Sequence, residues 1–324
     1  MDVVLNVVIV GTGDNLKKHA KAWSTIEGAA IVGIVDINGD QKQNRLKDLE
    51  THYRTSLEDL QLEKADVIDV CVPAGKRVEW VRKAVTQNCP IITDIAVGQT
   101  PGETSCMMDM FRNKSIPSYY GSEFHFSPAF INAQTQIKNG AIGKDGAMRL
   151  AVQKEHPGGK ENIFTELGAS LFTWVYDTFG NVDRVTTKHV QKTMANGSPM
   201  EYAVAMLRMG NGSFVHVELS WAGENERTSY EFTGDKGMLR YDSKESEPIL
   251  VENFVQPSES SDTDMTLTKS LLERQMEYIA SCIRFSEVPK VTEEQVMVGM
   301  KIAEAASKSA VIGEPIAIQR SESL

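Results

Sequence analysis

The sequence predicts an α/β protein, in which a doubly wound parallel sheet is followed by an α+β domain with an open, largely antiparallel sheet. Apolar segments alternate with segments of helical periodicity at βαβ spacing through the first third of the chain, which is typical of parallel sheets. Later, strand-like segments follow one another directly and are separated by turns rich in Gly, Asn and Asp. This second pattern favours an antiparallel sheet.

The parallel part begins with continuous apolar strands, as strands buried on both faces do. We expect strands at residues 5–13, 30–38, 67–75 and 90–93. Helical spacing of apolar residues predicts helices at 16–26, 41–53, 78–88 and 100–114.

In the later part, we expect helices at 132–143 and 164–180 on either side of a strand at 148–155. The antiparallel sheet is then predicted to contain strands at 182–191, 201–209, 213–222, 228–234 and 237–242. The segment TEEQ, Thr292–Gln295, has the pattern of a capping box and opens a helix that runs to Gly313.

Length and composition describe an ordinary globular protein of two domains. The chain has 324 residues and a net charge of -10, which argues against binding to a nucleic-acid backbone. No apolar run approaches the ~20 residues of a membrane span. The four cysteines form no CxxC pair and the histidines have no metal-ligand context. We therefore expect a cytoplasmic protein with reduced, buried cysteines, no bound metal and no membrane partner.

The first strand-to-helix turn has the pattern of a dinucleotide site. Gly11 permits a tight turn, and Gly13 lets backbone amides approach a pyrophosphate at the start of the helix. Asp36 closes the second strand, where a carboxylate accepts ribose hydroxyls and repels the 2′-phosphate of NADP. We predict a Rossmann domain that binds NAD, with NADP disfavoured, although a glycine turn can be merely structural. The predicted contacts from the turn are Gly11, Thr12, Gly13, Asp14, Asn15 and Leu16.

Several motifs together resemble the Gfo/Idh/MocA family of oxidoreductases. GTGDNLKKH is similar to the family's GxGxxGxxH, with His19 at the last position, and VCVPAG is similar to its Thr-Pro-Asn strand end. NGAIGK and the closing VTEEQVMVGMKIAEAASKSAVIGEPIAI are also family-like. The resemblance implies that Val72, Pro73 and Asp94 line the cofactor site. It also implies a homodimer or homotetramer that pairs through the open sheet face, and a small, sugar-like substrate.

On this basis we divide the chain into a dinucleotide-binding domain, residues 1–122, and a substrate and oligomerisation domain, residues 123–324. A helix at 292–312 that packs back towards the first domain is a further expectation.

The resemblance fails at the family's catalytic residues. The Glu-Lys-Pro motif aligns with Asp94-Ile95-Ala96, so the lysine is replaced by Ile95. The motif of an acid followed four residues later by histidine aligns with Glu166 and Ser170, so the histidine is replaced by serine. An arginine often found before Phe-x-Pro aligns with His125.

A hydride transfer to or from a carbonyl still needs a proton donor or an electrostatic stabiliser within hydrogen-bond reach. The candidates are His125, Glu166, Asp94 and Lys154, with His156 beside the last. Each has a plainer interpretation. His125 can pack among aromatic residues, Glu166 can be a surface acid, Asp94 can cap a turn, and Lys154 can belong to a solvated charge cluster.

Three functions fit these residues. The first, which we favour, is an NAD(P)-dependent oxidoreductase that acts on a sugar, cyclitol or similar polyol or keto substrate with a nonstandard catalytic site. The second is a catalytically degenerate NAD-binding regulator or sensor. The third is an enzyme that recycles a tightly bound NAD.

Overall fold

The computed structural model describes residues 4–38, 53–54, 56–57, 65–157, 161–194, 197–223, 225–245, 249–253 and 269–318. The chain forms two compact units, and each is built from two stretches of sequence. The first unit comprises Met1–Phe126 and Thr266–Val296, and the second comprises Ser127–Met265 and Met297–Leu324. The expected helix at 41–53 lies largely outside the described residues.

A six-stranded parallel sheet forms the centre of the first unit. Its order is β3-β2-β1-β4-β5-β6, which is that of a doubly wound dinucleotide-binding fold. The apolar runs form buried strands as expected. The strands are β1 (Leu5–Gly11), β2 (Ala29–Asp36), β3 (Tyr53–Arg54), β4 (Val67–Cys71), β5 (Ile91–Asp94) and β6 (Ser118–Gly121).

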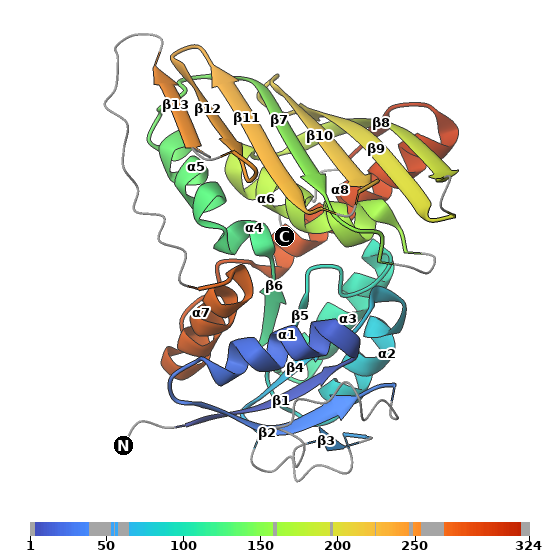
Figure 1. The fold of residues 1–324 in the computed structure, drawn as a ribbon, viewed down its shortest axis with the longest axis vertical. Coiled ribbons are helices and arrows are strands. Elements are labelled where there is room, and N and C mark those ends of the chain that lie inside the picture. The colour runs from blue at the N-terminus through green and yellow to red at the C-terminus, as the bar shows by residue number, and fades with distance from the viewer. Residues whose placement is uncertain are drawn as a thin grey trace. The chain divides into compact units, whose positions relative to one another are not determined.

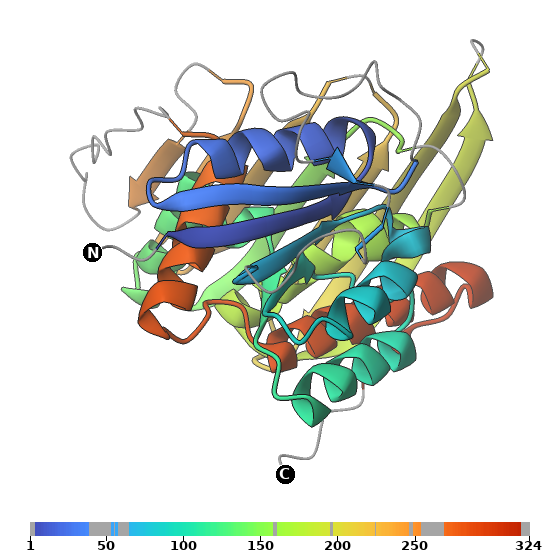
Figure 2. The same cartoon turned by 90° about the horizontal axis from the view of Figure 1, so that it is seen from below.

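Helices cover both faces of this sheet. Figure 2 shows α1 on one side of the strands, with α2 and α3 on the other. The helix α7 packs against α1 and α4, and its residues Met276, Ile279 and Cys282 belong to the same buried core as Trp23. The helices are α1 (Gly13–Ser24), α2 (Ala74–Val85), α3 (Pro101–Asn113), α4 (Glu123–Phe126) and α7 (Leu271–Phe285).

The second unit contains an eight-stranded sheet in the order β13-β12-β11-β7-β10-β9-β8-β14 (Figure 1). Within the described residues of this second sheet, only the pair β7–β10 is parallel, so the sheet is largely antiparallel as expected. The strands are β7 (Asp145–Gln153), β8 (Val182–Thr193), β9 (Pro199–Met209), β10 (Phe214–Trp221), β11 (Arg227–Gly234), β12 (Gly237–Asp242), β13 (Ile249–Asn253) and β14 (Ile316–Ala317).

Helices pack against one face of this sheet, and the aromatic core lies between them. Trp174 of α6 stacks on Phe232 of β11, with ring centroids 5.9 Å apart. Gly299 of α8 lies so close to Thr173 and Ala169 of α6 that a Cβ would collide with them, which explains the small residues there. The elements are α5 (Pro128–Lys138), the π-helix η4 (Phe164–Gly168), α6 (Ala169–Phe179) and α8 (Glu293–Ile312).

Three details differ from the sequence-based expectations. The segment expected as one helix at 164–180 begins as a π-helix and continues as an α-helix. The division at residues 122/123 assigned the segment of α7 to the second domain, whereas its apolar face packs in the first unit. Cys106 is exposed, while the other three cysteines are buried as expected.

The capping box of α8 is confirmed, because Thr292 and Gln295 each accept a hydrogen bond from the other's backbone N–H.

Candidate active site

The glycine turn between β1 and α1 has the shape that a dinucleotide needs. A Cβ on Gly11 would lie 2.5 Å from the Sγ of Cys71, so the close approach of β1 and β4 requires glycine here. Gly13 has a φ of +57°, in the left-handed region that favours glycine. Thr12 caps α1 without a side-chain hydrogen bond, and its hydroxyl therefore does not occupy the first amides of the helix. Those amides are suited to a phosphate.

The next three residues of the turn have different environments. The Asp14 side chain is 87% exposed and forms an ion pair with Lys17. Asn15 donates from Nδ2 to the carbonyl of Cys71 at 3.0 Å and ties the turn to the end of β4. Leu16 is buried in the core beneath the turn, so the larger side chain at the third motif position is accommodated by packing.

Asp36 lies at the same edge of the sheet as the glycine turn. It is the register partner of Gly11 in the parallel pair β1–β2. Its carboxylate is largely buried and accepts a hydrogen bond from the backbone N–H of Asn38 at 3.1 Å. A carboxylate fixed at the end of the second strand fits the ribose of a dinucleotide whose pyrophosphate lies on the turn. The first unit therefore fits NAD at this edge.

The ends of β4 and β5 are joined by Arg77, which the sequence analysis did not select. Its Nη2 donates to the Asp94 carboxylate at 2.8 Å and to the carbonyl of Val72 at 3.2 Å. Its Nη1 donates to the carbonyl of Ala96. The Asp94 carboxylate therefore forms an ion pair rather than serving only as a turn cap.

His125 lies just beyond β6, the strand next to β5. Its Nδ1 is 2.6 Å from the Oγ of Ser122, and the side chain is buried in the single turn α4. The backbone N–H of Ser122 donates to the Oε1 of Gln275 from α7 at 3.0 Å. Gly121 leaves room for this arrangement, because a Cβ there would lie 2.8 Å from the Nε2 of Gln275. The loop after β6 is thus fixed on two sides.

Ile95 and Ser170, which the resemblance aligns with the family lysine and histidine, are uncharged residues. Ile95 is buried directly after β5. Ser170 is half-buried in the first turn of α6, next to the close packing of α6 on α8. The cation Arg77 contacts the segment after β5, because its Nη1 donates a hydrogen bond to the carbonyl of Ala96.

The remaining candidates belong to the second unit. Glu166 lies on the π-helix η4 and is half-buried, with its backbone N–H bonded to the carbonyl of Asn162 at 2.8 Å. Single π-turns within helices are frequent at functional sites. Lys154 follows β7, and its backbone N–H donates to the carbonyl of Ser220 at 3.0 Å.

A second group of polar residues in this unit joins His156 to Glu201 and His189, which were not predicted as site residues. Glu201 lies 3.1 Å from the Nε2 of His189 and 3.7 Å from the Nε2 of His156. The ring of His156 also packs on Trp221, with centroids 4.9 Å apart. These side chains come from three strands and one loop, so no local pattern could have indicated their contact. Among the described residues, no group of three acidic, Cys or His side chains could hold a metal ion.

A buried ion pair lies in the first unit beneath the glycine turn. Asp69 of β4 is 1% exposed, and its Oδ2 accepts from the Nδ1 of His19 and the Nε1 of Trp23, both at 2.8 Å. Burial alone would lower the pKa of His19, but the neighbouring Asp69 carboxylate, with a smaller effect of Cys71, raises it well above 6.5. Asp69 is a carboxylate within the otherwise apolar strand VIDVC, and this feature of the sequence could have indicated that a buried cation pairs with it.

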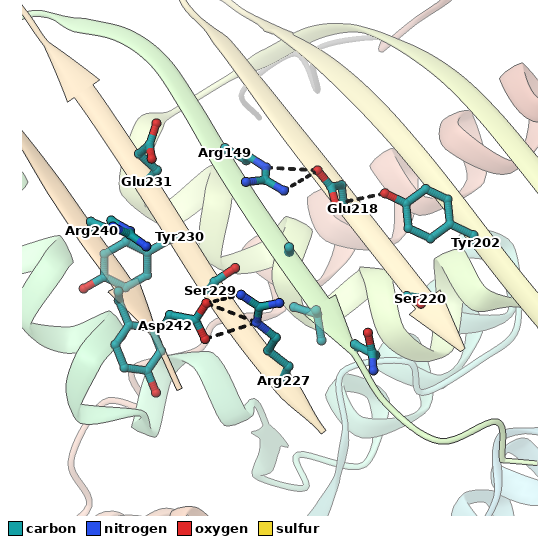
Figure 3. Close-up of a pocket in the computed structure, with 14 residues that line it drawn as sticks. Arg149, Tyr202, Glu218, Ser220, Arg227, Ser229, Tyr230, Glu231, Arg240 and Asp242 are labelled. Atoms are coloured by element: carbon teal, nitrogen blue, oxygen red, sulfur yellow. Dashed lines mark hydrogen bonds and ion pairs between the residues drawn. The ribbon is translucent and has the colours of Figure 1, made fainter. Parts of the chain in front are cut away.

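The second unit also has a pocket of about 240 Å³ on strands β7 and β9–β12. Figure 3 shows two ion pairs in this pocket, Arg149 with Glu218 and Arg227 with Asp242. Tyr202 donates to the second oxygen of Glu218 at 2.9 Å. None of the predicted catalytic residues lines this pocket.

The structure thus brings together, within the first unit, the glycine turn, Asp36, Asp94 and His125 along the carboxyl edge of one sheet. Glu166 and Lys154 lie in the second unit. Arg77, Gln275 and Ser122 support this edge and were not predicted.

Comparisons with known proteins agree with this arrangement. A model of an oxidoreductase family with an NAD-binding Rossmann fold matches residues 5–120, and the model of that family's C-terminal alpha/beta domain matches residues 136–318. An uncharacterized oxidoreductase of Bacillus subtilis, YrbE, is 22% identical over 98% of this chain and 97% of its own length.

Two further proteins are similar. A D-apiose dehydrogenase of Paraburkholderia graminis is 23% identical over 72% of this chain and 66% of its own length. The crystal structure of the WlbA dehydrogenase of Bordetella pertussis, in complex with NADH and UDP-GlcNAcA, superposes with a TM-score of 0.80 at 17% identity and covers 99% of both chains. The chain therefore belongs to the Gfo/Idh/MocA family and is an NAD-binding oxidoreductase.

Proposed function

We propose that this oxidoreductase acts on a polyhydroxylated, sugar-like or cyclitol-like substrate and that His125 is its principal acid–base residue. The observation that carries the proposal is the buried imidazole of His125, which is oriented by the Oγ of Ser122 at 2.6 Å, beside the strand that ends in Asp94. An imidazole with one nitrogen fixed by a hydroxyl can present the other nitrogen to a substrate oxygen.

The cofactor, when bound, accepts or donates the hydride. We assign the pyrophosphate to the backbone of Gly11, Thr12 and Gly13, and the adenosine ribose to Asp36. Val72 and Pro73, at the end of β4, line the same edge. The hydroxyl of Thr12, which caps no amide of α1, is available to the phosphates.

The chain's own residues supply proton transfer and binding. His125 holds or removes the proton of the reacting hydroxyl. Asp94 accepts hydrogen bonds, because its carboxylate is paired with Arg77. For Glu166 and Lys154, which belong to the second unit, a role in binding substrate stays a prediction. Two similar proteins support this substrate class: one acts on D-apiose by its name, and the other was crystallised with a UDP-sugar acid.

Replacing His125 with Asn tests the proposal. We expect kcat/KM for NAD-dependent oxidation of the best substrate among D-apiose, myo-inositol and related polyols to fall by about 10²–10⁴-fold. We also expect the variant to lose one limb of the pH–rate profile. His189→Asn, which changes a histidine of the second unit outside the sheet face that carries Glu218, is the matched control and should keep the wild-type kcat/KM. Turnover by His125→Asn within a few-fold of the wild type, or NADH binding without turnover of any polyol by the wild type, contradicts the proposal.

We further propose that two subunits pair through the sheet face that carries Glu218. On that face, alternate residues of β8–β10 include the exposed apolar side chains Val190, Met206 and Phe214. Exposed aromatic and Met side chains are enriched in protein interfaces. Light scattering at micromolar concentration should give at least a dimer, and Phe214→Glu should shift it towards monomer. A wild-type monomer under these conditions refutes the pairing.

A further inference from the structure

The guanidinium of Arg77 lies buried at the ends of β4 and β5, where it pairs with Asp94. The Arg77 side chain is 4% exposed, whereas the side chain of its partner Asp94 is 43% exposed. A molecule bound at this edge can therefore touch Asp94 while Arg77 stays beneath it. Any influence of Arg77 on that molecule passes through Asp94 or through the backbone.

Three acceptors fix the guanidinium in place. They are the carbonyl of Val72, the carboxylate of Asp94 and the carbonyl of Ala96. Val72 follows β4, and Asp94 and Ala96 end and follow β5, so one side chain connects the ends of two neighbouring parallel strands. Arginine presents several N–H donors in a rigid plane, and lysine cannot reproduce this fork of bonds. Arg77 therefore fixes both the Asp94 carboxylate and the backbone that follows β5.

The strand order shows which part of a dinucleotide this edge would meet. The sheet runs β3-β2-β1-β4-β5-β6, so β4 and β5 lie on the opposite side of β1 from Asp36. A dinucleotide with its pyrophosphate on the turn after β1 and its adenosine ribose at Asp36 extends its other half over β4 and β5. That half carries the nicotinamide.

We propose that Arg77 is a positioning residue for the nicotinamide half of the cofactor site. It orients Asp94 so that the second carboxylate oxygen, Oδ1, accepts a hydrogen bond from a hydroxyl of the bound molecule. Asp94 then has a binding role and moves no proton, because an ion-paired carboxylate is an acceptor only. The inference rests on the cofactor placement in the proposed function, but not on the identity of the substrate.

The test compares NADH with ADP, which lacks both the nicotinamide and the ribose attached to it, by calorimetric titration of Arg77→Met, Asp94→Asn and the double variant. A lost hydrogen bond to a charged group corresponds to roughly 10–100-fold in affinity, so we expect Arg77→Met to weaken NADH binding by that factor. ADP binding should stay unchanged. In the Asp94→Asn background, Arg77→Met should cause no further loss. Arg82→Met, which removes an exposed arginine from the same helix, is the control.

Equal losses for NADH and ADP, or losses that add in the double variant, would show that Arg77 only supports the fold. If Arg77→Met does not fold, the double variant and Arg77→Lys remain informative. The double variant leaves neither charge buried without its partner, and Arg77→Lys should retain ADP binding with intermediate NADH affinity. Wild-type protein that fails to bind ADP would instead refute the cofactor placement in the proposed function, so the two failures are distinguishable.

Discussion

Replacing His19 with Asn tests whether the ion pair beneath the glycine turn is charged in the folded protein. The Nδ1 of His19 and the carboxylate of Asp69 are 2.8 Å apart and both side chains are buried. Because the folded-state pKa of His19 lies above its ordinary value, the protonated ring contributes stability that is fully present below about pH 6.5. That stability is lost as the pH rises through the folded-state pKa.

The structure sets the size of the effect. Removing one partner of a buried ion pair costs about 3–5 kcal/mol. Asn keeps an N–H donor near the position of Nδ1, which retains a neutral hydrogen bond of about 1 kcal/mol. We therefore expect His19→Asn to lower the free energy of unfolding by about 2–4 kcal/mol in mild acid. The difference should shrink at alkaline pH, where the wild-type ring is neutral.

Urea unfolding followed by circular dichroism, from about pH 5.5 to about pH 9.5, measures this difference. Trp23→Phe removes a neutral donor from the same carboxylate and part of a fully buried ring, so it should cost about 1–3 kcal/mol, by a similar amount at every pH. A difference between wild type and His19→Asn that stays constant, or grows as the pH rises, would show that the folded protein holds a neutral imidazole at this site.

Three further predictions concern the first unit. Gly11→Ala should lower the free energy of unfolding by about 1–3 kcal/mol and weaken NADH binding, because the new Cβ collides with the sulfur of Cys71. Adding Cys71→Ala should recover part of the stability and part of the NADH affinity, and no recovery of either would argue against that collision. Asp36→Ser should bring NADPH affinity closer to NADH affinity in calorimetric titrations, and an unchanged preference would remove Asp36 from the ribose site. Ser270→Ala breaks the capping box with Glu273 and should cost about 1 kcal/mol in thermal unfolding, while an unchanged Tm would mean that α7 does not depend on its cap.

Local patterns were sufficient to predict most strands of the two sheets and the glycine turn after the first strand. The run Leu5–Gly11 is apolar without alternation, and two glycines and a carboxylate stand at fixed distances from strand ends. These features depend on neighbours in sequence, so spacing alone reveals them. The capping box at Thr292 is equally local.

Contacts between distant segments explain what was not predicted. Arg77 and Asp94 are 17 residues apart, and only the parallel pairing of β4 with β5 brings them together. The association of Glu201 with His156 and His189 depends in the same way on the register of β8 and β9. The segment of α7 has helical spacing, but nothing in its sequence shows which core receives its apolar face.

The placement of α7 also affects how the protein is made. The first unit is completed by a helix that follows most of the second unit in the chain, and Met276, Ile279 and Cys282 fill the same core as Trp23. A ribosome that has released only the dinucleotide-binding strands has therefore released a domain with an open apolar face. The glycine turn can form early, but its supporting core closes only after α7 has emerged, so the second unit is largely synthesised before the first one can finish folding.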